Sequence, residues 1–348
     1  MLRLKQINTI CVEPSGLPVP ANGDASSQNK EKEYFRCRIP GVVALEDGGA
    51  LLYYECRAGD SDWAATDIGM RRVLPDGTVG DRVILADGAG HNTMNNPVMI
   101  ADGDTVHLLY CENYRRVFYR RSVDAGSSWT AAKELTDQIE AGMKGVFFNA
   151  FAVGPGHGVR LSGGRLIVPV WFAYNRISPR AHHPSKISAL YSDDGGENWA
   201  LGEIVDTDQL TDPSETAVAE LPDGRVIVNI RNENPDKFRR TMTSRDGGLH
   251  WENLKIEKSL PDPVCCAGLC RAGDDLLFTN CEHPTERRNL TAKLLSPDGI
   301  IKEKMLLSDP AGYSDVCAFP DGRAYVFFER GRELFLEELV LIKMKNEK

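Results

Sequence analysis

The chain has 348 residues, 26% of them charged and 42% apolar, and a formal net charge of −9. This charge and the lack of a Lys/Arg-rich run argue against a nucleic-acid-binding or membrane-surface protein, because both need a concentrated basic patch. No stretch approaches the ~20 apolar residues of a membrane span. The nine irregularly spaced cysteines fit neither a disulfide framework nor a zinc site. We therefore expect a globular protein with reduced thiols and no metal or cofactor.

The N-terminal residues 1–16 contain no continuous apolar segment and no small-residue cleavage pattern, so they do not resemble a secretory signal peptide. The expected location is therefore the cytoplasm. If the natural protein carries a signal that this sequence lacks, the expected location is outside the cell.

Six hairpins are predicted along the chain, each made of an apolar run, a tight turn with glycine and a second apolar run. They span residues 42–56, 97–111, 159–172, 217–231, 269–281 and 315–329. Their turn glycines lie 49 to 61 residues apart, at Gly48, Gly103, Gly163, Gly224, Gly273 and Gly322. Asp-Gly and Gly-Gly between β-rich runs are strong hairpin signals.

A repeat of roughly 50 residues is typical of propellers and solenoids. Each interval between hairpins has room for two further strands, which completes a four-stranded blade. The sequence therefore predicts an all-β fold, a six-bladed β-propeller of four-stranded antiparallel blades. It is expected to occupy residues 1–348 as a single domain, without an accessory lectin or membrane domain.

A second repeat, Ser-x-Asp-x-Gly-x-x-Trp, runs in register with the hairpins. It occurs at residues 122–129, 192–199 and 244–251, and a degenerate copy without the tryptophan starts at Leu295. The Asp-Gly pair suits a turn in which the aspartate bonds its own backbone, and the tryptophan can pack against the adjoining blade. These are Asp-boxes, which sialidases share with several other propellers, so they indicate the fold and not the function.

Strand parity predicts which face of the propeller carries the reactive side chains. The turns between strands one and two and between strands three and four of each blade share one face. Segments that enter the first strand or leave the second therefore lie on the other face. Residues with potentially reactive side chains fall in these segments: Arg38, Asp62, Glu215, Arg231, Arg287, Tyr313 and Glu329. We expect them to converge at one end of the central channel, since loops on a rigid scaffold usually carry function.

Three of these residues are arginines: Arg38, Arg231 and Arg287. Arginines gathered at one site are costly unless they meet an anion, and their planar guanidinium groups suit a carboxylate. Five histidines show no metal-ligand spacing, and no catalytic role is assigned to them: His91, His157, His182, His183 and His283.

Around these residues the chain resembles the exo-α-sialidases (neuraminidases), and the resemblance covers nearly all of it. Tyr34–Pro40 looks like the family's Arg-Ile-Pro motif, which makes Arg38 the first carboxylate-binding arginine. The Glu-Cys-Arg run that ends at Arg57, with the acids after it, is similar to the stretch that holds the acid/base aspartate. Asp62 fits that aspartate best, Asp60 is the alternative, and Arg57 is a supporting residue.

Later segments extend the resemblance, including Gly154–Gly158, which matches another segment of the family. The resemblance assigns the remaining roles in chain order: Glu215 as partner of the nucleophilic tyrosine, Arg231 and Arg287 as second and third arginines, with Arg288 as the alternative to Arg287, Tyr313 as nucleophile, and Glu329 as the residue that orients Arg38. Met94–Pro97 departs from the family's Asn-Pro-Thr-Pro run, which leaves the preferred form of sialic acid open.

The resemblance implies retaining hydrolysis of terminal α-linked sialic acids through a covalent tyrosyl–sialosyl intermediate. Sialic acid carries a carboxylate on its anomeric carbon, so three arginines can hold it, and a neutral phenol attacks without charge repulsion. Glu215 would accept the proton of Tyr313, and Asp62 would protonate the leaving oxygen and then activate water. No cofactor or metal is implied.

Other functions are compatible with these residues. One is a trans-sialidase, or a sialidase selective for a deaminated or modified sialic acid. Another is a non-catalytic carbohydrate-binding propeller. Such a protein is expected to have lost Tyr313, Glu215 or Asp62, and all three are present. The expected partner is a sialylated oligosaccharide or glycoconjugate, with no nucleic acid or membrane.

Overall fold

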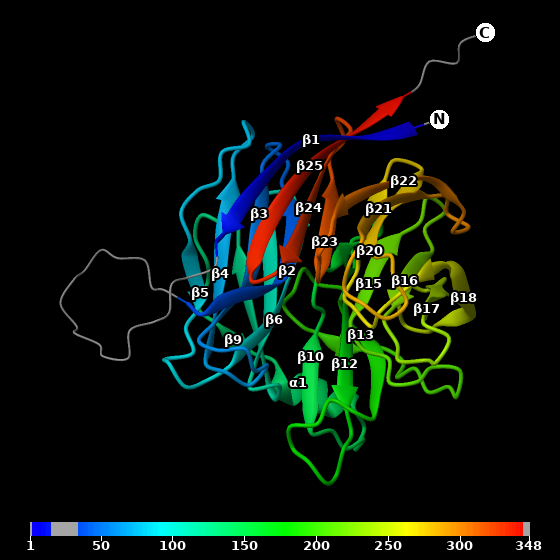
Figure 1. The fold of residues 1–348 in the computed structure, drawn as a ribbon. Helices are drawn as coiled ribbons and strands as arrows, with labels where there is room; N and C mark the ends of the chain where they lie inside the picture. Colours follow the sequence, from blue (N-terminus) through cyan, green and yellow to red (C-terminus); the bar gives the residue numbers. More distant parts are fainter. Residues whose placement is uncertain (1, 15–33, 344–348) are drawn as a thin grey trace, which may run out of the picture.

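The structure is a computed structural model that describes residues 2–14 and 34–343, and it confirms the predicted propeller (Figure 1). Within these residues, six antiparallel sheets form the blades, and the first strand of each blade neighbours the first strands of the two adjacent blades. The six predicted hairpins supply the first two strands of the six blades. The regular spacing of the turn glycines therefore marked the blade repeat correctly.

Blades one, two, four and five each consist of four strands that follow one another in the sequence. The strands of blades one and two are β2 (Arg36–Ala44), β3 (Ala50–Arg57), β4 (Thr66–Val73), β5 (Val83–Ala86), β6 (Met94–Asp102), β7 (Thr105–Glu112), β8 (Arg116–Ser122) and β9 (Lys133–Glu134). Those of blades four and five are β15 (Thr216–Glu220), β16 (Val226–Ile230), β17 (Phe238–Ser244), β18 (Glu252–Pro261), β19 (Gly268–Ala272), β20 (Asp275–Cys281), β21 (Leu290–Leu295) and β22 (Ile301–Ser308).

Blade three has a first strand that is broken in two. Its strands are β10 (Ala150–Val153), β11 (Val159–Arg160), β12 (Leu166–Ala173), β13 (Ser185–Ser192) and β14 (Ala200–Leu201). Both β10 and β11 pair with β12, and the segment from Gly154 to Gly158 leaves the sheet between them. A Cβ on Gly158 would lie 2.6 Å from the carbonyl oxygen of Ile167, so only glycine permits this close approach.

The tight turn of blade three corrects one detail of the predicted repeat. The residue with positive φ in that turn is Gly164, at +94°, and not Gly163. The amide of Gly164 donates to the carbonyl of Leu161, as the amide of Gly48 donates to Leu45 in blade one. Gly-Gly offers two candidates for the left-handed position, and the sequence spacing alone does not choose between them.

Blade six is closed by the N-terminal end of the chain, which the repeat did not predict. Its strands are β23 (Ser314–Ala318), β24 (Arg323–Arg330), β25 (Glu333–Lys343) and β1 (Leu2–Glu13). Strand β1 pairs antiparallel with β25 as the outermost strand, and Figure 1 shows the blue and red strands side by side. The first and last strands of the described chain therefore hold the ring shut.

Six apolar clusters occupy the interfaces between blades in the described part of the chain. The Asp-box tryptophans belong to them: Trp199 lies in the cluster between blades two and three, and Trp129 and Trp251 pack against neighbouring ones. In each box the serine hydroxyl bonds the aspartate, and in the first two boxes the indole N–H donates to the glycine carbonyl, as in Trp199 to Gly196 at 3.1 Å. The predicted fastening role is therefore confirmed.

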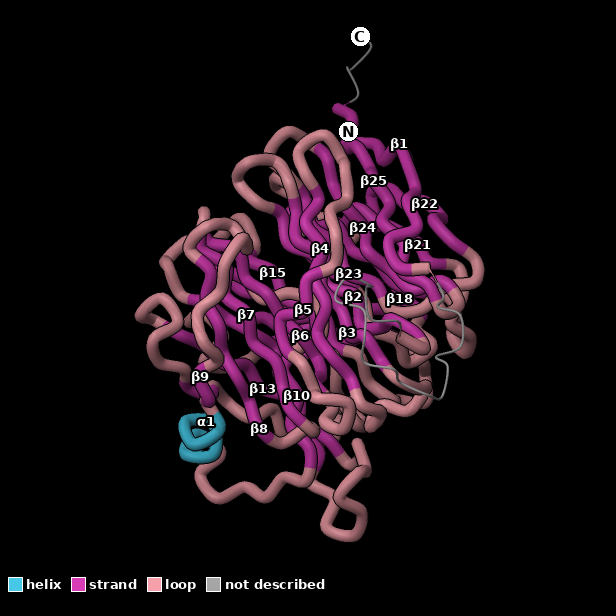
Figure 2. Tube along the Cα trace, turned by 90° about the vertical axis from the view of Figure 1, so that its left-hand side faces the viewer, coloured by secondary structure: helices cyan, strands magenta, loops and turns pink. Residues whose placement is uncertain are grey.

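Helix α1 (Thr136–Gly142) links blade two to blade three at the edge of the propeller (Figure 2). It packs against β8 and β14. No helix in residues 2–14 and 34–343 has the length and apolar character needed to span a membrane. All nine cysteines lie in the described residues as free thiols, and Cys11 alone among them is exposed.

Candidate active site

A cavity of about 230 Å³ lies where strand parity placed the reactive face. Its lining comes from segments that enter a first strand or leave a second strand in all six blades. Seven of the eight residues selected from the sequence line it: Arg38, Arg57, Asp62, Glu215, Arg231, Arg287 and Tyr313. The eighth, Glu329, lies directly behind Arg38. The propeller thus gathers residues that are up to 275 positions apart in the sequence.

The floor of the cavity is built around Tyr313, whose side chain is buried. Its hydroxyl donates a 2.5 Å hydrogen bond to Glu215 Oε1, and it accepts one of 3.0 Å from Arg231 Nη1. The same Arg231 nitrogen also forms an ion pair with Glu215 Oε2. Tyrosine, acid and arginine therefore form a closed triangle in which a proton can pass from the phenol to the carboxylate.

Burial raises the pKa of Tyr313 well above its ordinary value, because a phenolate is poorly solvated there. Three arginines oppose that effect. The guanidinium carbons of Arg38 and Arg287 each lie 5.0 Å from the centre of the Tyr313 ring, and Arg231 contacts its oxygen. The ring of cations would stabilise a negative charge on the phenol oxygen.

Arg38 is held by Glu329 through a bidentate ion pair. Arg38 Nε donates to Glu329 Oε1 at 3.0 Å, and Nη2 donates to Oε2 at 3.3 Å. The backbone amides of Ile39 and Tyr313 donate to the same carboxylate. These bonds and the positive charge of Arg38 lower the pKa of Glu329 despite its burial. Glu329 therefore fixes Arg38 and the backbone of Tyr313 together.

Asp62 lines the cavity next to Arg38, whose Nη1 lies 3.8 Å from Asp62 Oδ1, and its side chain is 44% exposed. Arg57 Nη1 donates to Asp62 Oδ1 at 2.7 Å, and Arg57 Nε donates to the fully buried Glu55 at 2.7 Å. Burial raises the pKa of Glu55. For Asp62, burial acts in the same direction but is outweighed by Arg57 and Arg38, which lower its pKa. Asp62 is thus a solvent-accessible carboxylate whose charged form is stabilised by two arginines.

The two alternatives left open by the sequence lie outside the cavity lining. Asp60 forms an ion pair with Arg36 at 2.8 Å on the surface. Arg288 is exposed and pairs with Asp309 at 2.7 Å. Arg287 donates instead to the carbonyl of Val264, and within the described residues it has no carboxylate partner. Geometry therefore favours Asp62 and Arg287 over their neighbours.

An aromatic wall completes the cavity, and sequence reasoning did not select its residues. Tyr114, Trp171 and His182 line the cavity, and their ring centroids lie 4.9 to 6.1 Å apart. In the described structure the indole N–H of Trp171 and Nε2 of His182 have no hydrogen-bond partner. Burial lowers the pKa of His182, which keeps the ring neutral. Tyr114 and His182 leave second strands, so the parity rule contained the signal to find them.

A second set of side chains at the rim has the composition of a metal site. Potential ligand atoms of His183, Asp212 and Glu233 lie within 4.8 Å of one another. Among the described residues, this is the group of histidine and acidic side chains close enough together to hold a metal ion. His183 Nε2 is 3.5 Å from Glu233, and its Nδ1 is 3.9 Å from Asp212. The three residues come from separate loops, so their sequence spacing carries no metal signature.

Residues 52–326 match the family of BNR repeat-like domains. The chain belongs to this family. It is 28% identical over 323 residues to a sialidase of Bacteroides fragilis (strain YCH46), covering 80% of this chain and 57% of that protein. It is 32% identical over 264 residues to human sialidase-4, covering 67% and 53% of the two chains. The resemblance to sialidases inferred from the motifs is therefore confirmed.

The fold of a solved sialidase is also similar. The Trypanosoma rangeli sialidase in complex with 2,3-difluorosialic acid, described as a covalent intermediate, superposes with a TM-score of 0.75 at 19% identity. The match covers 98% of this chain and 60% of that one. The chain spans little more than half the length of the Bacteroides fragilis sialidase and of human sialidase-4.

Proposed function

We propose that this protein is an exo-α-sialidase that releases terminal α-linked sialic acids with retention, through a covalent intermediate on Tyr313. The observation that carries the proposal is the buried triangle of Tyr313, Glu215 and Arg231 beneath two further arginines. A phenol hydrogen-bonded to a carboxylate and surrounded by cations is suited to attack a carbon that bears a carboxylate. The similarity to bacterial and mammalian sialidases supports the same activity.

The substrate carboxylate would be held by Arg38, Arg231 and Arg287. Arg287 has no carboxylate partner in the described residues, and Nε of Arg231 has no hydrogen-bond partner there. Two of the three guanidinium groups thus retain donors for an incoming anion. Arg38 is already oriented by Glu329, so little side-chain freedom would be lost on binding.

In the first step, the oxygen of Tyr313 bonds to the anomeric carbon while the bond from that carbon to the leaving oxygen breaks. The phenolic proton passes to Glu215, and Asp62 gives its proton to the leaving oxygen. In the second step, a water attacks the anomeric carbon, Asp62 takes its proton, and the bond to Tyr313 breaks. Glu215 then returns the proton to the phenol, which restores every group.

Asp62 must be protonated to act first as an acid, although Arg57 and Arg38 lower its pKa in the free protein. A bound sialic acid brings its own carboxylate to Arg38 and displaces water from the 44%-exposed Asp62 side chain. Both changes weaken the stabilisation of the Asp62 carboxylate and would raise its pKa in the complex. Substrate binding would therefore prepare the acid that the reaction needs.

The test is fluorescent release from aryl α-glycosides of N-acetylneuraminic acid and of its deaminated analogue. We expect release from at least one substrate, and its loss in the Tyr313→Phe variant with the folded state intact by circular dichroism. Incubation with 2,3-difluorosialic acid should add one sugar to a peptide that contains Tyr313, as seen by mass spectrometry. Near wild-type turnover in Tyr313→Phe would refute the tyrosine mechanism, and no release from a folded wild-type protein would refute the activity.

A further inference from the structure

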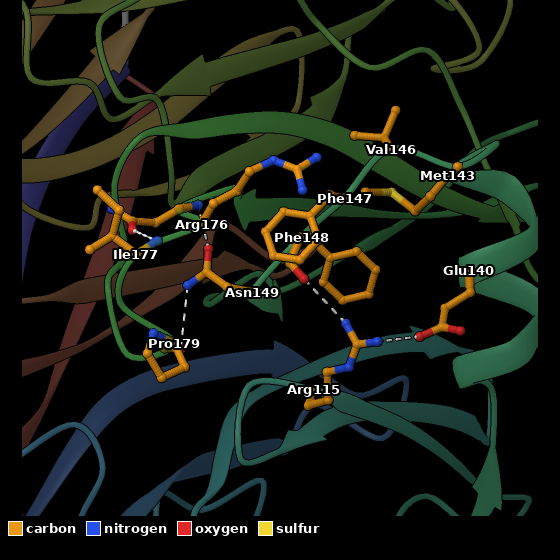
Figure 3. A pocket seen from close by; sticks show the side chains of 12 residues that line it. Arg115, Glu140, Met143, Val146, Phe147, Phe148, Asn149, Arg176, Ile177 and Pro179 are labelled. Atoms are coloured by element: carbon orange, nitrogen blue, oxygen red, sulfur yellow. Dashed lines mark hydrogen bonds and ion pairs between the residues drawn. The ribbon is translucent and has the colours of Figure 1, made fainter.

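A groove larger than the catalytic cavity, about 560 Å³, lies between blades two and three (Figure 3). Its rim carries apolar side chains that are unusually exposed for their type. Phe147 is 40% exposed and Ile177 is 95% exposed. The guanidinium carbon of Arg176 lies 4.4 Å from the Phe147 ring centroid, and Figure 3 shows these two side chains together. The groove therefore combines an aromatic face with a cation.

The groove and the catalytic cavity share their dividing wall. Tyr114 lines the cavity, and the next residue, Arg115, lines the groove. In the loop after β12, Arg176 lines the groove and His182 lines the cavity. Asn149, which lines the groove, donates to the carbonyl of Ala181 in that loop at 2.7 Å. A ligand that projects from the cavity over this wall would reach the groove.

The aromatic wall of the cavity also lies close to the residue that follows Asp62. Trp63 follows Asp62, and its ring centroid is 6.0 Å from that of His182. The guanidinium carbon of Arg180 lies 5.5 Å from the Trp63 ring centroid. Since Asp62 would protonate the leaving oxygen, the sugar attached to that oxygen would emerge near Trp63 and Arg180, and Arg180 lies in the same loop as Arg176.

Arg176 and Arg180 are exposed, and neither forms an ion pair with an acid in the described residues. Two acids that line the groove or the cavity are already paired with an arginine. Glu140 in the groove pairs with Arg115 at 2.7 Å, and Asp62 pairs with Arg57. Each of the two guanidinium groups lies over an aromatic ring and has no acidic partner among the described residues. Both can therefore bind an anion, since arginine offers several hydrogen-bond donors and no acceptor.

We propose that the groove binds the sugar next to the scissile bond when that sugar carries a negative charge, and that Arg176 and Arg180 select such substrates. The shared chemistry is an anionic group on the penultimate sugar, whether the carboxylate of a second sialic acid or a sulfate ester. The aromatic ring of Phe147 would pack against the apolar face of the same sugar. This inference rests on the proposed sialidase activity and names its substrate class.

The test compares kcat/KM for four sialosides whose leaving groups differ in charge: an α-linked sialic acid dimer, a sialoside of sulfated lactose, sialyl-lactose and an aryl sialoside. The double variant Arg176→Gln/Arg180→Gln removes the two cations. Arg245→Gln is the control for the loss of an exposed cation far from the groove, because its side chain is 72% exposed in an Asp-box on the opposite face.

At low ionic strength the double variant should lower kcat/KM for an anionic leaving sugar about fivefold, through KM, as expected for about 1 kcal/mol of exposed ion pairing. Sialyl-lactose and the aryl sialoside should be unaffected, and Arg245→Gln should change nothing. A lower kcat/KM for the sialic acid dimer alone would show that the two arginines recognise a carboxylate. A lower kcat/KM for both the dimer and the sulfated sialoside would show that they accept either a carboxylate or a sulfate. Equal losses on charged and neutral substrates, or none, would overturn the inference while aryl turnover persists. Absence of aryl turnover in the wild type would overturn the proposed function as well.

Discussion

A buried ion pair across the centre of the propeller yields a prediction about stability. His157, in the segment that interrupts the first strand of blade three, lies with Nδ1 2.8 Å from Asp315 Oδ1 in blade six. The other carboxylate oxygen accepts a 3.0 Å bond from the amide of Val42 in blade one. The side chains of His157 and Asp315 are 12% and 2% exposed. Three blades are therefore joined through one carboxylate.

Replacing His157 with alanine removes a charge-assisted hydrogen bond and leaves the Asp315 carboxylate without its cation. Breaking a buried pair in this way is expected to lower the free energy of unfolding by about 3 kcal/mol. His250 provides a matched control, since its Nδ1 lies 2.7 Å from Asp246 but the two side chains are 76% and 41% exposed. Water replaces that contact, so His250→Ala should change the unfolding midpoint little.

The measurement is urea unfolding followed by tryptophan fluorescence for the wild type and the two variants. The contribution of His157 should also depend on pH. Burial opposes protonation of His157, but Asp315 outweighs it, so the pKa of the folded state is raised above the ordinary value of about 6.5. The ionic part of the stabilisation is complete below that ordinary value and is lost as pH rises through the raised pKa. The deficit of His157→Ala should therefore shrink toward alkaline pH.

Equal midpoint shifts for His157→Ala and His250→Ala would refute the argument, because they would show that burial does not determine the strength of the pair. A deficit that grows toward alkaline pH would contradict the assigned sign. Because Asp315 lies two residues after Tyr313 at the start of β23, we expect His157→Ala to reduce turnover as well.

Three further predictions follow from the site and the blades. Glu329→Gln leaves Arg38 without its ionic anchor, so kcat/KM for an aryl sialoside should fall about tenfold or more with the fold retained; an unchanged value would contradict the orienting role. The pKa of Asp62 is lowered in the free protein, and kcat/KM reports the free protein whereas kcat reports the substrate complex. As pH rises, kcat/KM should therefore begin to decline at a lower pH than kcat. Declines of kcat/KM and kcat at the same pH would show that substrate binding does not raise the pKa of Asp62. Trp199→Ala should cost about 4 kcal/mol in urea unfolding and Trp251→Ala clearly less, because the first side chain is the more buried; equal losses would contradict this order.

Local sequence determined the repeat, because each hairpin is built from contacts between neighbouring residues. The Asp-Gly and Gly-Gly turns and the Asp-boxes specify their own backbone geometry, so they could be recognised without any knowledge of the ring. Strand alternation then fixed the face on which Arg38, Glu215 and Tyr313 lie. Even the choice of Asp62 over Asp60 followed from the motif, and the cavity contains the first and not the second.

Tertiary structure decided whatever depends on partners from different blades. The sequence of strand β1 does not indicate that its partner is β25, because the residues of one strand do not specify which sheet edge it will pair with. The lowered pKa of Asp62 arises from Arg57 and Arg38, and the groove beside it arises where loops of blades two and three meet. The sequence by itself thus determined the blades, their order and the face of the candidate site. The closure of the ring, the charge state of the site and the surface beyond it required the fold, because they result from contacts between residues far apart in the chain.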